Sequence, residues 1–179
     1  VAAASGRYGL FIEDLNYALD GGLYAEMLEN RNFEAKDAHG AWDNYIVEDD
    51  GGYAWEAYPA GASSLIKIKT DRPLFPENPH YMRLTVTEGG QGVKNKAYDG
   101  IYLKAGEVYK ISFYARSYDY RGKAQVGVYS DGAPVFAKKI KLHADGKWHR
   151  YAFRVKSKKN AEKAAFALTL LKAGAVHLD

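Results

Sequence analysis

Residues 100–117 read GIYLKAGEVYKISFYARS, two alternating segments joined by a Lys-Ala-Gly-Glu turn. In the second segment, apolar or aromatic residues occupy every other position: Tyr109, Ile111, Phe113 and Ala115. Successive side chains of a β-strand point to opposite faces, so this pattern predicts a strand with one face in a core. Tyr114 and Arg116 then belong to the other face.

The same alternation extends in both directions along the chain. Asp131-Gly132 and Asp145-Gly146 are strong turn signals between such segments. The clearest strand patterns cover residues 63–69, 80–86, 123–130, 147–157 and 164–171. Eight or nine strands with regular turns predict an all-β fold, an antiparallel β-sandwich of the jelly-roll kind, over residues 33–179.

The beginning of the chain has a different pattern. Residues 8–34 contain a continuous apolar run, Leu10–Ile12, which is typical of a strand buried on both faces. Asp20 then precedes two glycines, and Leu23, Met27 and Leu28 make a stripe that predicts a helix over residues 22–30. A strand followed by a helix is half of a β/α unit, so residues 1–32 are predicted to be a separate part.

The composition limits the classes of function. The chain has 179 residues, of which 47% are hydrophobic, enough to bury a real core. Its 25 basic and 22 acidic residues give a net charge of +3, which argues against a dedicated nucleic-acid surface. No apolar run is long enough for a membrane helix. The chain has no cysteine, which excludes disulfides and thiolate chemistry. The absence of cysteine does not fix the compartment, and an extracellular or periplasmic location is favoured.

No complete catalytic set is visible. Glycoside hydrolysis needs two carboxylates about 5–10 Å apart. Glu13 and Asp14 are adjacent on a predicted strand and therefore point to opposite faces, and Asp49-Asp50 has the same defect. The chain also lacks a G-x-S-x-G nucleophile motif and a complete phosphate-binding loop. We therefore assign no catalytic residue.

Sugar binding is the chemistry that remains. Aromatic rings stack on the C–H faces of sugars, while polar side chains bind the hydroxyls. Four such residues fall on the non-core faces of two consecutive strands and form one patch if those strands are neighbours: Tyr114, Arg116, Gln125 and Tyr129. Other aromatic candidates lie in or near loops: Trp42, Trp55, Tyr58 and Tyr98. The alternative is that these rings serve only packing.

Two acidic residues suit a structural cation. Glu34 and Asp179 lie at the two ends of the predicted sandwich, and carboxylate oxygens are ligands that calcium prefers. These positions admit a structural calcium ion, although ordinary surface acids explain them equally well. No cofactor is required.

Residues 8–34 resemble the N-terminal motif of the glycoside hydrolase family fifty-one α-L-arabinofuranosidases. Residues 78–117, NPHYMRLTVTEGGQGVKNKAYDGIYLKAGEVYKISFYARS, resemble the carbohydrate-binding-like module of the family four/nine type found near the start of many such enzymes. The resemblance implies that the first strand and helix belong to a catalytic (β/α)8 barrel, with the sandwich inserted after them. Glu13 matches the glutamate that ends the first barrel strand and binds the substrate arabinofuranose.

The sequence departs from this family where catalysis is concerned. The family's acid/base glutamate follows an asparagine, and this chain has no Asn-Glu dipeptide. The resemblance therefore implies a non-catalytic module that binds plant cell-wall arabinan or arabinoxylan beside the rest of the catalytic domain. Two alternatives are a structural module that braces the barrel or an oligomer, and the arabinofuranosidase activity of the parent. The strand at Leu10–Ile12 must pack on the sandwich, pair with another copy, or be poorly ordered.

Overall fold

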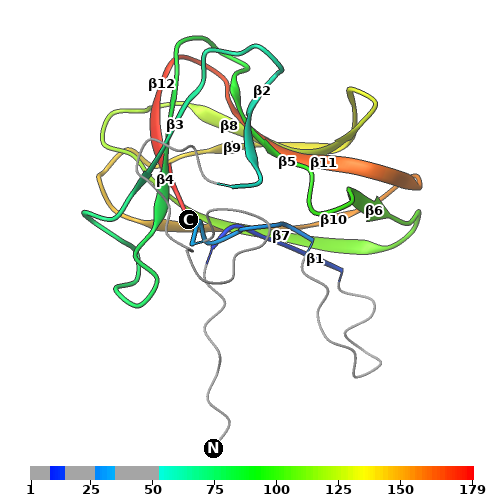
Figure 1. Ribbon diagram of the computed structural model, residues 1–179. Helices are drawn as coiled ribbons and strands as arrows, with labels where there is room; N and C mark the ends of the chain where they lie inside the picture. The colour runs from blue at the N-terminus through cyan, green and yellow to red at the C-terminus, as the bar shows by residue number, and fades with distance from the viewer. Residues whose placement is uncertain (1–8, 15–26, 35–52) are drawn as a thin grey trace, which may run out of the picture.

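The computed structural model describes residues 9–14, 27–34 and 53–179. Every regular element within these ranges is a β-strand, and all paired strands are antiparallel. The strands form two six-stranded sheets that pack face to face (Figure 1). The predicted antiparallel β-sandwich is confirmed.

The first sheet, called sheet A, has the order β1-β7-β12-β4-β3, and β10 lies on the other edge of β7. Short β1 and β12 follow one another along a single edge of β7, because β1 pairs with residues 109–112 and β12 with residues 115–116. The strands of sheet A are β1 (Phe11–Asp14), β3 (Leu65–Lys69), β4 (Tyr81–Val86), β7 (Val108–Arg116), β10 (His149–Lys156) and β12 (Gly174–Leu178).

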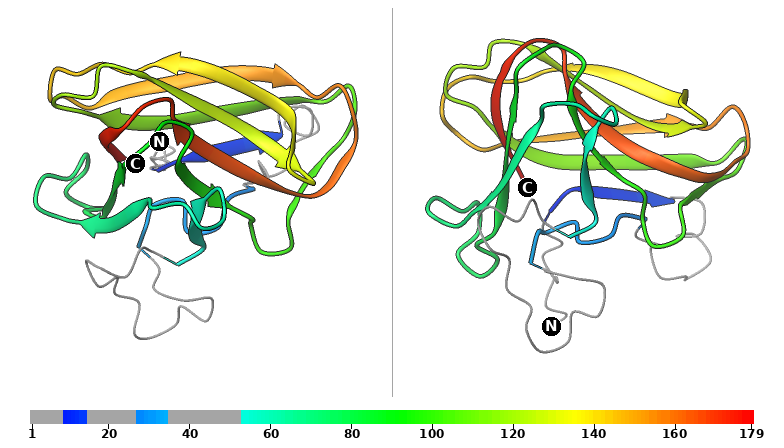
Figure 2. Two further views of the ribbon diagram at one scale, coloured as in Figure 1. Left: turned by 90° about the horizontal axis from the view of Figure 1, so that it is seen from above. Right: turned by 45° about the horizontal axis from the view of Figure 1, so that its top comes forward.

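The second sheet, called sheet B, has the order β2-β5-β11-β8-β9, and β6 also pairs with β11. Its strands are β2 (Trp55–Tyr58), β5 (Gly92–Asn95), β6 (Ile101–Leu103), β8 (Lys123–Ser130), β9 (Ala133–Lys141) and β11 (Ala161–Leu170). The turn at residues 104–107 therefore carries the chain from sheet B to sheet A, as the two layers in Figure 2 show.

The core lies between the sheets and follows the predicted alternation. Met82, Leu84 and Val86 of β4 are buried, as is the whole alternating set of β7. Sheet B contributes buried residues of β8 and β11: Ala124, Val126, Val128, Phe166, Leu168 and Leu170. Burial of this much apolar surface is the main favourable term in the stability of the sandwich.

The first strand packs on the sandwich, which is one of the three outcomes considered above. β1 pairs with β7, from Phe11 opposite Ser112 to Asp14 opposite Tyr109. Leu10 and Ile12 are fully buried in the common core. Because β1 occupies this edge of β7, the edge is not open to strands of other chains.

The predicted helix is wrong over residues 27–30, and its earlier part lies outside the described residues. Residues 29–33 form a bend and a turn. The reason is that these amides find partners elsewhere: Met27 N donates to Ile12 O at 3.2 Å and Glu29 N to Asn95 Oδ1 at 3.4 Å. Asn30 and Phe33 have φ angles of 45° and 60°, which a right-handed helix does not allow. The barrel origin of residues 1–32 stays a prediction.

Candidate carbohydrate-binding face

The site is built on the outer face of sheet B, the side turned away from sheet A. In an antiparallel pair, residues directly opposite one another share a face. Because Ala124, Val126 and Val128 are in the core, Gln125, Gly127 and Tyr129 lie on the outer face. The strand register extends this face to Ala167, Thr169, Gly92, Lys94 and Tyr58, and we call the whole set the sheet B face.

Two tyrosines and a glutamine form the centre of the sheet B face. The ring centroids of Tyr58 and Tyr129 are 5.8 Å apart with an interplanar angle of 41°. Gln125 Nε2 donates a hydrogen bond to Tyr129 Oη at 2.9 Å. Burial, followed by the neighbouring Tyr129, raises the pKa of Tyr58. The cluster therefore holds two aromatic rings and an amide close together.

Small residues below the rings make this arrangement feasible. Tyr58 and Tyr129 come from β2 and β8, which are separated in the sheet by β5 and β11, so their rings meet above those two central strands. Ala167 is only 2% exposed and Thr169 only 5%, although both lie on the outer face. Ala167 and Thr169 are buried because the rings of Tyr58 and Tyr129 extend over them.

Gly92 is required by the close approach of neighbouring strands. A Cβ atom at Gly92 would lie 1.9 Å from the carbonyl oxygen of Leu168, and one at Gly127 would lie 2.4 Å from that of Phe136. These distances are far below van der Waals contact, so a side chain at either position would push the strands apart. The glycines thus keep the floor of the sheet B face free of side chains.

Charged groups border the aromatic centre. Lys94 Nζ lies 3.2 Å from Glu56 Oε2, and Lys96 Nζ lies 2.9 Å from Glu56 Oε1. The hydrogen bond from Lys96 holds the pKa of Glu56 below its usual value. Exposed ion pairs of this kind add little stability. Together with Gln125 and Thr169 they offer donors and acceptors for the hydroxyls of a bound sugar.

The predicted patch of four residues does not form. β7 belongs to sheet A and β8 to sheet B, so Tyr114 and Arg116 lie on a different sheet from Gln125 and Tyr129. The ring of Tyr114 meets Phe75 edge-on at 6.0 Å. Arg116 is only 5% exposed, which contradicts its predicted accessible position. Its Nη1 donates to Arg72 O at 2.9 Å, so the 72–75 loop covers the outer end of β7.

The remaining predicted residues fall in several places. Trp55 is buried against Phe33 and Phe166 and is not accessible to a sugar. Tyr98 is 87% exposed between β5 and β6. Glu13 lies in β1 opposite Lys110, but its side chain, like all of Trp42, lies outside the described residues. The roles predicted for Glu13, Gln125 and Tyr129 in sugar binding stay predictions.

The structure brings Glu34 and Asp179 into electrostatic contact. Glu34 Oε1 accepts a hydrogen bond from His80 N at 3.0 Å, and Glu34 Oε2 contacts His80 Nδ1. Asp179 is fully buried, and within the described residues neither of its carboxylate oxygens has a hydrogen-bond partner. Burial, with the charge of Glu34, raises the pKa of Asp179 to about 7. A bound cation would offset this cost, but no group of three or more acidic or histidine ligands is arranged for one among residues 9–14, 27–34 and 53–179.

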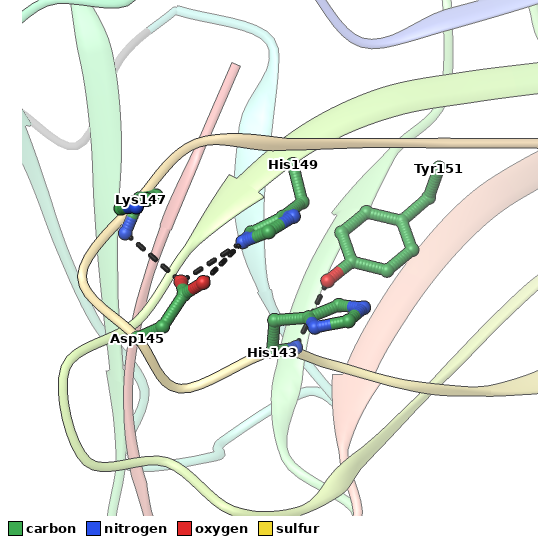
Figure 3. Close-up of polar contacts among 5 residues, drawn as sticks. All are labelled: His143, Asp145, Lys147, His149 and Tyr151. Carbon is green, nitrogen blue, oxygen red and sulfur yellow. Dashed lines mark hydrogen bonds and ion pairs between the residues drawn. The ribbon is translucent and has the colours of Figure 1, made fainter.

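A histidine pair braces the connection between β9 and β10 (Figure 3). The rings of His143 and His149 stack with centroids 4.3 Å apart and planes 16° apart. Asp145 accepts hydrogen bonds from His149 Nε2 at 2.9 Å and from Lys147 N at 3.1 Å. His143 N donates to Tyr151 Oη at 2.9 Å. These contacts fix the turn, and the bond from His149 lowers the pKa of Asp145.

In the part of the chain that the structure describes, no helix has the length and apolar character that crossing a membrane needs.

Comparison with known proteins identifies the family. A family model described as "Carbohydrate binding domain" matches residues 25–174. The chain therefore belongs to this family of carbohydrate-binding domains. The match covers the sheet B face completely.

The curated relatives are arabinofuranosidases, which confirms the resemblance drawn from the sequence. Alpha-L-arabinofuranosidase 1 of Arabidopsis thaliana is 30% identical over 186 residues, covering 96% of this chain and 26% of that protein. The extracellular exo-alpha-L-arabinofuranosidase of Streptomyces chartreusis is 28% identical, covering 96% of this chain and 19% of that protein. The chain thus spans about a quarter or less of these two relatives.

A solved structure shares the fold. It contains the CBM22-1 and GH10 modules of Clostridium thermocellum xylanase 10B complexed with xylohexaose. It is 14% identical with a TM-score of 0.52, covering 70% of this chain and 25% of that one. At this identity the likeness supports the sandwich fold alone.

Proposed function

We propose that this chain is a non-catalytic module that binds arabinose- or xylose-containing plant polysaccharide on the sheet B face. The observation that carries the proposal is the Tyr58–Tyr129–Gln125 cluster, which offers aromatic surface and hydrogen-bonding groups on one face of a carbohydrate-binding fold. The arabinofuranosidase relatives favour arabinan and arabinoxylan, and the xylohexaose named for the solved structure makes unsubstituted xylan the next glycan to compare.

In the proposed whole protein, the rest of a catalytic domain is the module's partner. Residues 1–32 would contribute the first part of a barrel, with Glu13 at its sugar site, and residues 33–179 would form the binding module. Within the described residues, the acid pair Glu34–Asp179 cannot cut a glycosidic bond, because Asp179 is fully buried and Glu34 is engaged by His80.

The chemistry of Asp179 also supports a structural cation as part of this proposal. Among the residues that the structure describes, its two buried oxygens have no hydrogen-bond donor, and the neighbouring Glu34 adds a second negative charge. Both residues are oxygen donors of the type that calcium prefers, and these two side chains would hold it.

The binding proposal is tested by calorimetric titration of the chain with arabinan, arabinoxylan and xylan. Tyr129→Ala is expected to weaken binding by about tenfold, because truncating an aromatic residue at the centre of a binding surface typically costs more than 1 kcal/mol. Tyr58→Ala should have a similar effect. Circular dichroism of each variant establishes that the fold is retained.

Tyr114→Ala is the matched control, since it removes the same ring from sheet A and should leave the affinity unchanged. Loss of binding in Tyr114→Ala with none in Tyr129→Ala would move the site to sheet A. If the folded chain binds none of the three glycans, the structural alternative, in which the module only braces the barrel or an oligomer, replaces this proposal.

A further inference from the structure

A pocket lies on the outer face of sheet A, away from the sheet B face. Its volume is about 220 Å³, and most of its lining residues lie on β4, β12 and β7, which are adjacent in the sheet. Arg83, His177 and Arg116 lie side by side there, because His177 pairs with Arg83 on one side and with Arg116 on the other. Ser117, Tyr118, Asp119 and Ala175 complete the lining.

Arg116 is held in place almost entirely by aromatic rings and neutral acceptors. Its guanidinium carbon lies 4.6 Å from the ring centroid of Trp148 and 5.2 Å from that of Tyr81. Its Nε donates to His177 Nδ1 at 3.1 Å, and its Nη2 lies 2.9 Å from the same atom. Among the residues that the structure describes, no acidic side chain forms an ion pair with Arg116 or Arg83.

The charge balance of this pocket favours an anion. Arg83 is exposed, whereas Arg116, on the other side of His177, is buried. Burial, followed by the charges of Arg116 and Arg83, lowers the pKa of His177 to about 4. His177 is therefore neutral at physiological pH, and since its Nδ1 accepts from Arg116, its Nε2 carries the proton and is a donor. Two acids lie nearby: Asp119 at the pocket and Asp71, which accepts a hydrogen bond from Tyr81 Oη at 2.7 Å. The charge of Arg72 also acts on His177, so three guanidinium groups face two carboxylates.

The rim adds an aromatic surface suited to a sugar ring. Tyr118 is 52% exposed and lines the pocket, and its hydroxyl accepts a hydrogen bond from Arg72 Nη1 at 3.2 Å. Pockets for drug-sized ligands typically have roughly 300–1,000 Å³. The smaller volume here fits one sugar residue with a single charged substituent.

We infer that the Arg83–Arg116–His177 pocket binds the carboxylate of a uronic acid residue in an acidic plant polysaccharide, with the sugar ring against Tyr118. Guanidinium groups bind carboxylates through charge-assisted hydrogen bonds, and Arg83 is placed to make them with its fork of N–H donors. This site is separate from the sheet B face, so the module would hold neutral and acidic stretches of the cell wall on opposite sheets.

The test is calorimetric titration of the chain with an oligogalacturonate and with a glucuronic acid-substituted xylo-oligosaccharide, which separates the two sources of the carboxylate. Each is compared with its carboxyl-reduced form. Arg83→Gln is expected to weaken binding of the acidic sugar by at least about tenfold, as loss of a hydrogen bond to a charged group does. Arg83→Lys, which keeps the charge, should lose less.

Arg154→Gln is the matched control, because it removes the same charge from an exposed residue of β10 in the same sheet, outside the pocket. Tyr129→Ala should leave the binding of uronic acid unchanged, which separates this inference from the function proposed for the sheet B face. The inference is overturned if Arg83→Gln and Arg154→Gln lose the same affinity, or if the carboxyl-reduced sugar binds as tightly as the acidic one. It is also overturned if neither acidic oligosaccharide binds.

Discussion

Trp55→Ala is expected to lower the free energy of unfolding by about 3–5 kcal/mol, the usual cost of truncating a buried Trp or Phe to Ala. Trp55 connects residues 27–34 to the sandwich. Its ring packs on Phe33 with centroids 5.5 Å apart and meets Phe166 of β11 edge-on at 6.3 Å. Its Nε1 donates to the carbonyl of Asn30 at 3.0 Å.

Removal of the Trp55 ring leaves a cavity where residues 27–34, β2 and β11 meet. Urea unfolding followed by circular dichroism measures the change.

Two further variants divide this effect into its parts. Trp55→Phe keeps most of the ring contacts but loses the hydrogen bond to Asn30, so part of the loss, about 1 kcal/mol, is assigned to that bond. Tyr98→Ala removes an exposed ring and should change the stability by less than about 0.5 kcal/mol. If Trp55→Ala proves as mild as Tyr98→Ala, residues 27–34 do not pack on sheet B as described.

The strands of this protein are visible in the sequence because alternation is a local property. In β7, the buried positions from Tyr109 to Ala115 follow directly from the period of two, and so do those of β4. The sheet to which a strand belongs is not a local property. The turn at residues 104–107 has the same composition whether it closes a hairpin or crosses between sheets, and here it crosses.

That non-local choice decides how much of the site could be predicted. Gln125 and Tyr129 lie on one face of one strand, which follows from the sequence, and the structure joins the ends of their side chains by a hydrogen bond. Tyr58 joins them only because three successive pairings, β2 with β5, β5 with β11 and β11 with β8, build one sheet. The alternation of β7 correctly places Arg116 on the face away from the core, but it does not show that other residues cover that face. The burial of Arg116 depends on Tyr81, Trp148 and the 72–75 loop, which are distant in sequence.

Asp179→Asn is expected to stabilise the protein at pH 8 by up to about 4 kcal/mol relative to the unmodified chain, with little difference at pH 4. The pKa of the Asp179 carboxyl is about 7 in the folded state, against a usual value of 3.8. Between these values the folded protein keeps a proton that the unfolded chain releases, so stability falls as the pH rises. A pKa shift of this size corresponds to about 4 kcal/mol of unfolding free energy, at 1.36 kcal/mol per pH unit. The amide of Asp179→Asn does not ionise, so the variant keeps this free energy at pH 8.

His177 makes the comparison more specific, because its contribution has the opposite sign. Its pKa is about 4 in the folded state and 6.5 ordinarily, so between these values the unfolded chain binds the additional proton and stability rises with pH. In the unmodified chain the two slopes nearly cancel between pH 4 and 6.5. In Asp179→Asn only the contribution of His177 remains, so the unfolding free energy rises by about 3 kcal/mol between pH 4 and 6.5. Urea unfolding at half-unit pH intervals measures both curves.

Calcium provides an independent check on the same carboxylate. At pH 8 the buried anion of Asp179 lacks a protein donor within the described residues, so a bound cation should recover part of the stability lost by its ionisation. We expect millimolar calcium to raise the melting temperature of the unmodified chain at pH 8 and to have little effect on Asp179→Asn or at pH 4. If the unfolding free energies of the unmodified chain and Asp179→Asn change with pH in parallel, Asp179 ionises at its ordinary pKa. A calcium response of equal size in both would place the ion elsewhere.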